Sequence, residues 1–544
     1  MRVAQAVGQV LAELGVERCF GVVGSGNFEV TNALVAGGVR FLPTRHESGA
    51  VTAADAYARV SGHVGLVTVH QGPGLTNSVT GLAEAAKSRT PMLVLAGDSP
   101  AGARHSNFQM DQAGLAESVG ALSETLGGAE GAVADVLRAW GRALSERKPV
   151  VVTMPIDVQA AECAVPDSFK APPLPAPAPP DAESLSVAAR LLTAARRPLL
   201  LAGRGAVLAG AGPPIQRLAR ATGALLATSA VANGLFAGDP YYLGIAGGFA
   251  TPLAAELMAS ADAVVAFGAS LNMWTTRHGR LLSPTARVIQ VDLEADAIGA
   301  HHGAALGVVG DAAETARALL DLVGGGSAQT WRTPELAAEI ARRRWRDEPY
   351  ADASTDGRID PRTLVVALDD LLPAERLLAC DGGHFMGWLP MYCAVPDQQG
   401  MVFTQAFQAI GGGFATAVGA AVARPDRLVV CGLGDGGALM GLSELETLVR
   451  LGLPVLCVVF NDAAYGAEVH HFGPSGAKLD AVRFPDTDFA ALGRAAGAAA
   501  MTVRRREDLV ALGEWLGRRN RPMVVDAKIV PTVVAEWLPE AFGH

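Results

Sequence analysis

Cysteine is scarce in this chain and is not arranged for chemistry. Only six cysteines occur among 544 residues, at positions 19, 163, 380, 393, 431 and 457. They are scattered, stand mostly in apolar surroundings and never form a CxxC pair. Disulfide scaffolds and cysteine zinc sites need recurrent, closely spaced cysteines, so the sequence argues against both. This usage is typical of a reducing cytoplasm, and we expect a cytoplasmic protein.

Basic charge and long apolar runs are also lacking. Lys and Arg number 44 against 54 Asp and Glu, the formal net charge is −10, and the only dense basic run is Arg342–Arg346. No basic stripe is available for phosphates, which argues against a nucleic-acid partner. No uninterrupted apolar run has the length of a membrane span, and the N-terminus lacks the features of a signal peptide. We therefore expect no membrane partner.

Apolar residues, by contrast, are abundant and regularly placed. Half of the residues are hydrophobic and 18% are charged, which is typical of an ordered protein, and the length indicates three domains. Apolar strand-like runs alternate with helix-like segments, which predicts an α/β fold of three doubly wound parallel sheets. Proline-rich and glycine-rich stretches mark the joints. The predicted parts are 1–164, a linker at 165–184, a central domain at 185–323, a linker and helix at 324–356, and 357–544.

The stretch LVVCGLGDGGALMG (428–441) places one carboxylate inside a glycine cluster at the end of an apolar strand. A helix-like segment follows, and then a second apolar strand that ends on Asn461. Parallel strands joined in this way finish at the same sheet edge, roughly 4.8 Å apart, so oxygens of Asp435 and Asn461 can reach one cation. Such ligands suit magnesium. A helix cap and a turn would explain either residue alone, but the pair favours a metal that holds a diphosphate.

The segment GDGGALMGLSELETLVRLGLPVLCVVFND (434–462) resembles the GDG…N signature of enzymes that use thiamin diphosphate. The resemblance covers the whole chain, in the order pyrimidine-binding, central and diphosphate-binding domain. Within that superfamily the sequence is similar to acetolactate synthase and to 2-oxo acid decarboxylases, with features of benzoylformate decarboxylase. It implies Asp435, Asn461 and the carbonyl oxygen of Ala463 as magnesium ligands. Asp462 departs from the second asparagine of many members.

The resemblance also implies which carboxylate activates the cofactor. Glu47, in LPTRHESGA, matches the family's RHE motif, whose glutamate binds the aminopyrimidine and helps it deprotonate the reactive C2 carbon. A helix-start carboxylate is the alternative. Ile410 matches the aliphatic residue that supports the bent cofactor. Further residues implied around the cofactor are Gly434, Gly436, Gly437, Tyr465, His384 and Gln109.

Substrate-side residues are indicated by three segments. His70 and Gln71 precede the GPG turn where acetolactate synthases usually carry small hydroxyl residues, and a histidine there resembles the proton-transfer group of benzoylformate decarboxylase. A hydrogen-bonding role to the backbone is the alternative for His70. Ser25 lies near a serine position of the same enzyme. Glu468 stands where pyruvate-decarboxylase-type enzymes hold an acid, and a solvent-facing helix glutamate is its alternative.

The central domain raises the question of a second cofactor. In acetolactate synthases this domain binds FAD, and AGRGA, GIAGGFATP and VDLEADAIG lie where its contacts would fall. However, GASLNMWTTRHG replaces the arginine- and aspartate-bearing segment expected of flavin binders. FAD stays an alternative, and a central domain without flavin is favoured.

The resemblance implies a magnesium- and thiamin-diphosphate-dependent enzyme that decarboxylates a 2-oxo acid. Ligation of the resulting enamine to a second carbonyl is favoured by overall similarity, and simple release of an aldehyde is favoured by His70 and Glu468. A flavin-dependent oxidase of the pyruvate oxidase type and a catalytically silent thiamin-binding subunit are two further hypotheses. By the family pattern Glu47 meets the diphosphate site of another subunit, so a homodimer is the minimum active unit and a homotetramer is favoured. The substrate is not determined by the sequence.

Overall fold

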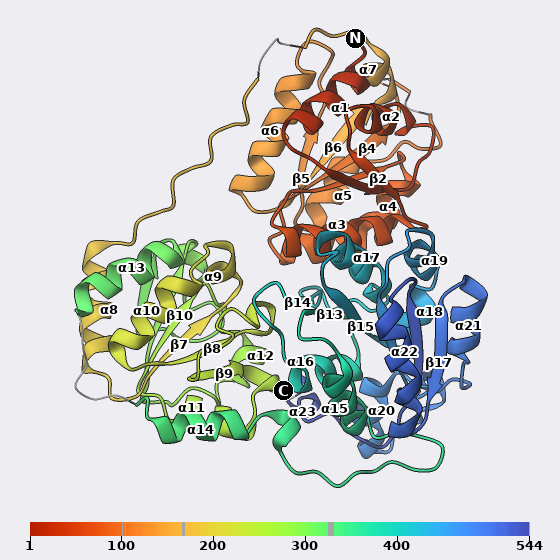
Figure 1. Cartoon of the computed structure of the whole chain (residues 1–544). Helices are drawn as coiled ribbons and strands as arrows, with labels where there is room; N and C mark the ends of the chain where they lie inside the picture. The colour runs from red at the N-terminus through yellow and green to blue at the C-terminus, as the bar shows by residue number, and fades with distance from the viewer. Residues whose placement is uncertain (101, 104, 166–168, 325–330, 543–544) are drawn as a thin grey trace.

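The computed structural model describes residues 1–100, 102–103, 105–165, 169–324 and 331–542. Three lobes, each built around one sheet, follow one another along the chain (Figure 1). The chain between the first and second lobes forms no helix or strand from residue 169 to 181 and runs along the outside of the molecule. Residues 166–168 and 325–330 of the predicted linkers lie outside the described residues.

The first sheet has six parallel strands in the order β2-β1-β3-β4-β6-β5. Its strands are β1 (Arg18–Gly21), β2 (Arg40–Pro43), β3 (Gly65–Val69), β4 (Met92–Asp98), β5 (Leu122–Thr125) and β6 (Pro149–Pro155). The helices around it are α1 (Val3–Glu13), α2 (Phe28–Ala36), α3 (Glu47–Ser61), α4 (Pro73–Lys87), α5 (Gln112–Ser118), α6 (Ala132–Ser145) and α7 (Ile156–Ala160).

The central sheet is also parallel, in the order β12-β11-β10-β7-β8-β9. It consists of β7 (Pro198–Ala202), β8 (Leu225–Thr228), β9 (Tyr242–Ile245), β10 (Ala263–Phe267), β11 (Arg287–Asp292) and β12 (Leu306–Val309). Helices α8 (Ala182–Ala194), α9 (Arg204–Leu208), α10 (Gly212–Thr222), α11 (Pro252–Ala259), α12 (Met273–Thr276), α13 (Ala312–Val323) and α14 (Pro334–Arg342) belong to this lobe.

The third sheet repeats the strand pattern of the first, in the order β14-β13-β15-β16-β18-β17. Its strands are β13 (Arg376–Cys380), β14 (Met401–Phe403), β15 (Leu428–Gly434), β16 (Leu456–Asn461), β17 (Ala499–Val503) and β18 (Met523–Lys528). Its helices are α15 (Pro361–Leu371), α16 (Trp388–Tyr392), α17 (Gly413–Ala423), α18 (Asp435–Met440), α19 (Ser443–Arg450), α20 (Gly466–Phe472), α21 (Phe489–Ala496), α22 (Val510–Arg518) and α23 (Leu538–Ala541). The predicted fold class of three doubly wound parallel sheets is confirmed.

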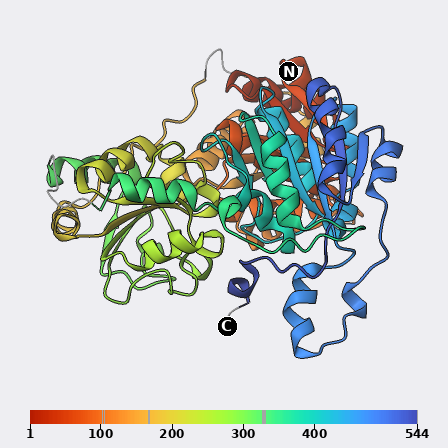
Figure 2. The ribbon, with the colours of Figure 1, turned by 60° about the horizontal axis from the view of Figure 1, so that its bottom comes forward.

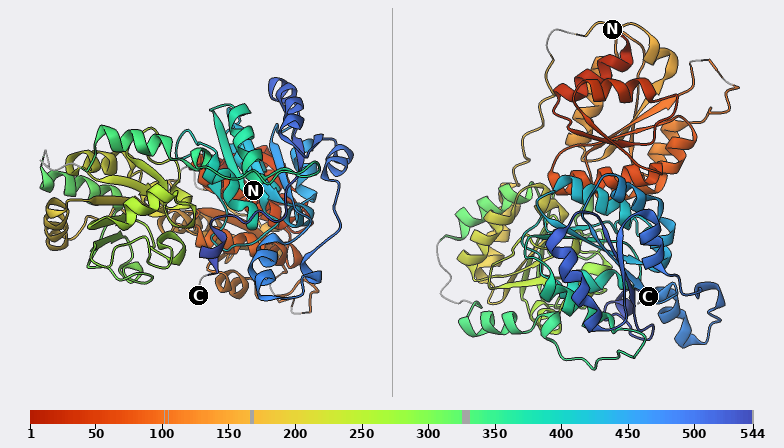
Figure 3. Two further views of the ribbon diagram at one scale, coloured as in Figure 1. Left: turned by 90° about the horizontal axis from the view of Figure 1, so that it is seen from below. Right: turned by 45° about the vertical axis from the view of Figure 1, so that its right-hand side comes forward.

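Continuous apolar strands explain why these sheets are parallel and covered on both faces. All six residues of β16 and the first six of β15 are buried, as expected where helices pack on each side of a sheet. The first and third lobes are joined by α3 and α17, which lie side by side (Figure 1; Figure 3, right). A Cβ atom at Gly419 would lie 2.0 Å from the carbonyl oxygen of Ala53, so the two helices touch through their backbones. Small residues on both helices allow one apolar core to run through the two lobes.

The segment that carries α20 and the chain after it projects from the body of the third lobe, and α23 contacts α20 (Figure 2). Among the described residues, no helix combines the length and the apolar character that crossing a membrane requires.

Candidate active site

Asp435 and Asn461 stand at adjoining strand ends of the third sheet. Gly434 of β15 pairs with Phe460 of β16, and each of the two polar residues follows directly. Asp435 Oδ2 accepts a hydrogen bond from Ala464 N at 3.2 Å, and Asn461 Oδ1 accepts one from Ala463 N at 3.3 Å. Both side chains therefore reach the same short turn, as the strand–helix–strand spacing predicted.

The turn between the two side chains has an unusual backbone at Ala463. This residue adopts a φ of +60°, in the left-handed region that costs a non-glycine residue free energy. Its carbonyl oxygen accepts from Phe484 N at 2.8 Å, and a carbonyl oxygen has a second lone pair for a cation. The strained turn thus places a third oxygen that could bind a cation near the carboxylate and the amide.

The amide of Asn461 is oriented by a buried polar network. Its Nδ2 group donates to Thr487 O and to Asp526 Oδ1, both at 3.0 Å, so the amide oxygen is the atom left to face Ala463. Asp526 is fully buried and also pairs with Lys528 Nζ at 3.0 Å. Our sequence analysis missed Asp526 and Lys528. The sequence signal that could have identified them is a pair of charged residues, two positions apart, in the otherwise apolar strand β18.

Burial disfavours the charged form of the carboxyl groups at this turn. It raises the pKa of Asp435 to about 6, although backbone N–H groups oppose the shift. Burial and the charge of Asp435 raise the pKa of Asp462 to about 7. A carboxylate, an amide oxygen and a carbonyl oxygen are the hard ligands that magnesium takes. The described residues contain no group of three or more His, Cys, Asp or Glu suited to a metal, so a thiolate- or imidazole-rich metal site is not among them.

The glycines of the GDGG segment make room for neighbouring side chains. A Cβ atom at Gly434 would lie 2.7 Å from the Phe385 ring, and one at Gly436 would lie 2.4 Å from the Tyr465 ring. A Cβ atom at Gly437 would meet a carboxylate oxygen of Asp381 at 2.6 Å. None of the three glycines adopts a positive φ. Close packing against these side chains therefore requires glycine here.

His384 is buried beside this turn and has a partner that the sequence did not indicate. Its Nε2 atom accepts a hydrogen bond from Ala535 N at 2.8 Å, and its ring centre lies 4.4 Å from that of His470. Burial, with a smaller effect of His470, lowers its pKa to about 3. His384 is therefore neutral with its proton on Nδ1, and Nδ1 lies near Gly466, 3.4 Å from where a Cβ atom there would stand. The N–H group faces the first residue of α20.

Replacement of His384 by Gln should reduce the loss of unfolding free energy that occurs as the pH falls. The folded chain holds His384 neutral down to about pH 3, whereas an unfolded histidine takes up a proton near pH 6.5. The unfolded state binds more protons in that window, so the free energy of unfolding falls as the pH falls. From pH 6.5 to 5 the wild type should lose up to about 2 kcal/mol more than His384→Gln. Urea unfolding at several pH values measures this, with the exposed His301→Gln as control; equal slopes for all three proteins would contradict it.

Glu47 begins α3 at the carboxyl end of the first sheet and is half-buried. Its Oε2 atom accepts from Asn77 Nδ2 on α4 at 3.0 Å, a contact that our sequence analysis missed. His70, at the end of β3, is close enough for Glu47 to raise its pKa, yet burial dominates and lowers it. His70 Nδ1 accepts from Gly26 N at 3.0 Å, so the proton of the neutral ring lies on Nε2. An acid and a histidine are thus placed together, with the histidine's tautomer set.

The loop that carries Ser25 packs directly on His70 and Gln71. A Cβ atom at Gly24 would lie 2.8 Å from the His70 ring, and one at Gly26 would lie 1.5 Å from Gln71 Oε1. Ser25 itself is exposed, whereas Gln71 is buried beneath the loop. Gln71 therefore faces the interior of the first lobe, and its contacts are those of a residue that shapes the loop.

The remaining predicted residues lie on exposed or partly exposed segments. Gln109 is exposed and follows Phe108, whose ring meets the His70 ring edge-on at 5.1 Å. Ile410 precedes α17 with 36% of its surface exposed, and Glu468 lies half-buried on α20. The structure thus forms one group around Glu47 and His70 and another around Asp435 and Asn461. Among the hydrogen bonds and ion pairs of the described residues, none joins the two groups.

The central-lobe loops predicted as possible flavin contacts are packed on one another. Arg277 donates from Nε to Gly247 O and from its terminal nitrogen to Ala250 O, both at 2.9 Å. A Cβ atom at Gly248 would lie 2.8 Å from the Trp274 ring. The GASLNMWTTRHG segment therefore places an indole and a guanidinium against the GIAGGFATP loop.

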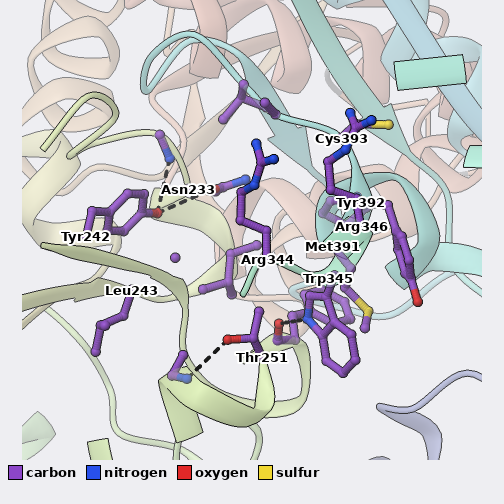
Figure 4. Close-up of a pocket in the computed structure, with 18 of the residues that line it drawn as sticks. Asn233, Tyr242, Leu243, Thr251, Arg344, Trp345, Arg346, Met391, Tyr392 and Cys393 are labelled. Carbon is purple, nitrogen blue, oxygen red and sulfur yellow. Dashed lines mark hydrogen bonds between the residues drawn. The ribbon is translucent and has the colours of Figure 1, made fainter. Parts of the chain in front are cut away.

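A cavity of about 340 Å³ lies elsewhere, between the central and third lobes (Figure 4). Its wall includes Tyr242, Arg344 and Tyr392. Trp345 donates from its indole to Phe249 O at 2.7 Å, and Arg344 pairs with Asp347. None of the predicted catalytic or metal-binding residues lines this cavity.

Three family models match the chain in succession. They are the thiamine pyrophosphate enzyme N-terminal TPP binding domain at residues 1–116, the central domain at 185–319 and the C-terminal TPP binding domain at 381–527. Together they account for most of the chain, and the two groups of candidate residues fall in the N-terminal and C-terminal matches.

Similar proteins are known from several bacteria. The chain is 29% identical to a sulfoacetaldehyde acetyltransferase of Castellaniella defragrans, over 94% of this chain and 89% of that protein. It is 30% identical to the acetolactate synthase large subunit of Parasynechococcus marenigrum, over 84% and 76%. It is 30% identical to the acetolactate synthase isozyme 2 large subunit of Escherichia coli strain K12, over 86% and 84%. With three matching domains and these relatives, the chain belongs to the thiamine pyrophosphate enzymes and resembles acetolactate synthases.

Proposed function

We propose that this enzyme uses thiamin diphosphate and magnesium to decarboxylate a 2-oxo acid and to ligate the product to a second carbonyl compound. The observation that carries the proposal is the meeting of Asp435, Asn461 and the Ala463 carbonyl at one turn, with Asn461 oriented by Asp526. These oxygens suit a magnesium ion that binds a diphosphate. The relatives named acetolactate synthase support the ligation.

Each candidate residue has a role in this proposal. Thiamin diphosphate, when bound, would supply a nucleophilic C2 carbanion and a thiazolium ring that takes up the electron pair released by decarboxylation. Glu47 is assigned to bind and activate the pyrimidine end of the cofactor, and Asn77 orients its carboxyl group. His70 presents its Nε2–H group beside Glu47, where it can give a proton to an intermediate or orient a substrate oxygen. Tyr465, His384 and Ile410 are proposed to line the cofactor, and Ser25, Gln109 and Glu468 the substrate side.

A homodimer would bring the two residue groups together. Within one chain, no hydrogen bond or ion pair among the described residues joins Glu47 to the Asp435 turn. Exposed apolar side chains also surround the third-lobe group: Phe407 (45%), Ile410 (36%), Leu439 (47%) and Met440 (62%). An apolar surface of this kind favours burial by a second subunit. We therefore propose that Glu47 of one subunit faces the metal site of another, in a dimer or a tetramer.

Flavin is not part of the proposal. The loops where it would bind are closed by Arg277 and Trp274. A pyruvate oxidase type of activity is a second candidate only if purified protein is yellow and consumes oxygen. Simple decarboxylation, which the resemblance of His70 and Glu468 to decarboxylase residues favours, is the main alternative.

A panel of 2-oxo acids should distinguish these activities. Carbon dioxide release should require both thiamin diphosphate and magnesium, and adding an aldehyde or a second 2-oxo acid should produce a longer product by mass spectrometry. Sulfoacetaldehyde, for which relatives are named, has no carboxylate to lose, so it is tested separately and its consumption is followed by mass spectrometry. Aldehyde release despite a supplied acceptor would replace ligation by simple decarboxylation. Cofactor binding without turnover of any compound would favour a silent subunit.

A further inference from the structure

A buried glutamate of the third lobe holds the backbone that leads into Glu47. Glu444 on α19 is 3% exposed, and its Oε1 atom accepts from Arg45 N at 3.0 Å and from His46 N at 2.9 Å. Its other oxygen accepts from the Thr447 hydroxyl at 2.6 Å. Arg450, from the same helix, donates to Pro43 O at 2.6 Å. The end of the edge strand β2 is therefore held by a glutamate and an arginine that lie about 400 residues further along the chain.

A buried glutamate of the first lobe does the same for the backbone that leads towards Ile410. Glu84 on α4 is 5% exposed and accepts from Ala406 N at 3.1 Å and from Phe407 N at 2.7 Å. Arg59, on α3, donates to Phe403 O at 2.6 Å and pairs with Glu84 at 3.5 Å. Phe403 is the last residue of β14, the edge strand that corresponds to β2 in the order of the third sheet.

The two sets of contacts are similar, although one oxygen of Glu444 accepts both N–H groups and each oxygen of Glu84 accepts one. In each, a carboxylate accepts from two consecutive N–H groups and an arginine donates to a carbonyl oxygen at the end of an edge strand. In each, the segment whose N–H groups bind the carboxylate leads into a helix at the lobe boundary. Arg45 and His46 precede α3, and Phe407 precedes α17. We propose that Glu444 and Glu84 are reciprocal positioning residues, through which each lobe sets the backbone that carries the other lobe's cofactor-facing side chain. This rests on the proposed roles of Glu47 and Ile410.

Simple adhesion between the lobes does not account for this chemistry. Helices α3 and α17 already pack through small apolar side chains, and burying a carboxylate costs more than burying a methyl group. Two consecutive N–H groups converging on a carboxylate specify where the backbone lies, because each charge-assisted bond is short and directional. Gly49 permits the approach, since a Cβ atom there would lie 2.5 Å from Glu444 Oε1. A displacement of about 1 Å at a catalytic side chain costs about 100-fold in rate.

Glu444→Ala is expected to release the segment before Glu47 without disturbing the metal turn. In the protein without cofactor, hydrogen exchange at the amides of Arg45 and His46 should become about tenfold faster or more. In the enzyme with thiamin diphosphate and magnesium, kcat should fall by about tenfold or more while the cofactor Kd changes by less than about threefold. Glu446→Ala is the matched control, because Glu446 lies two residues away and binds the side chains of Arg45 and Arg450 at the surface.

Glu84→Ala should show the reciprocal pattern. Exchange at the amides of Ala406 and Phe407 should accelerate, and the cofactor Kd should rise by about tenfold, since Ile410 follows on that loop. If either alanine variant does not fold, Glu444→Asp or Glu84→Asp replaces it. The aspartate side chain is shorter by one methylene, so its carboxylate lies further from the backbone N–H groups while the charge is kept. Glu444→Gln should behave like the wild type, since one amide oxygen can still accept from both Arg45 N and His46 N. Glu84→Gln should instead lose one of its two backbone bonds, because Ala406 N and Phe407 N donate to different oxygens of Glu84.

The outcomes separate this proposal from the function on which it rests. Exchange rates, kcat and Kd equal to those of Glu446→Ala would overturn the positioning role. If the alanine variants show faster exchange but the wild type binds no thiamin diphosphate, the role of the two glutamates in holding the backbone is supported and the proposed function is wrong.

Discussion

Glu47→Gln should bind thiamin diphosphate almost as tightly as the wild type and lose about 10³-fold in kcat. Glutamine is nearly the same size and its amide oxygen can still accept from Asn77 Nδ2, so the local fold should persist. The amide cannot hold or transfer the proton that we assign to the carboxyl group. Steady-state turnover of the best 2-oxo acid and calorimetric titration with the cofactor measure the two quantities. The exposed Glu13→Gln on α1 serves as control.

Turnover of Glu47→Gln within about tenfold of the wild type would falsify the assignment of the activating acid. A parallel loss of cofactor binding and of turnover would indicate that Glu47 holds the structure of the site and does no proton transfer. Because the control keeps Glu47, it should match the wild type in both measurements.

Asp435→Ala should abolish magnesium-dependent binding of thiamin diphosphate, with a rise in Kd of about 100-fold or more. Asp435 provides the only side-chain charge among the three proposed ligands, and Asn461 and the Ala463 carbonyl are neutral. A chelator added to the wild type should have the same effect as the substitution, and the two effects should not add. Cofactor titrations with and without magnesium test this directly.

Asp462→Asn is the matched control for Asp435→Ala. It removes a carboxylate one residue beyond Asn461 and restores the asparagine that many members of the family carry at this position. Cofactor binding should stay within about threefold of the wild type, because the ligand positions are unchanged. If Asp462→Asn loses binding while Asp435→Ala keeps it, the carboxylate that serves the metal is Asp462, and our ligand set is wrong.

The strand–helix–strand spacing was enough to predict that Asp435 and Asn461 meet at one sheet edge, because that geometry is local. A parallel crossover must return to the same edge of the sheet, so Asp435 and Asn461 had to lie side by side once both strands were recognised. The same reasoning placed Glu47 and His70 at the carboxyl ends of strands. Periodicity and turn chemistry act over a few tens of residues, which is the range over which these strand ends are specified.

Residues whose partners are distant in the chain were not predicted. Nothing near His384 in the sequence indicates that it accepts from Ala535, and nothing near Glu444 indicates Arg45. Asp526 and Lys528 have meaning only once β18 is known to lie beside β16. The interpretation of the GDGG glycines was incomplete for the same reason, since the rings of Phe385 and Tyr465 reach them through the tertiary fold.

The amino-acid sequence alone determined the α/β class, the three parallel sheets and the identity of the residues at the strand ends, because apolar strand runs and glycine turns are specified by neighbours along the chain. Only the tertiary structure decided the amide orientation of Asn461, the tautomers of His70 and His384, and the carboxylates that hold Arg45, His46, Ala406 and Phe407. These depend on which groups meet in a dry interior, where each buried hydrogen-bonding group must find a partner, and that partner is chosen by packing between lobes.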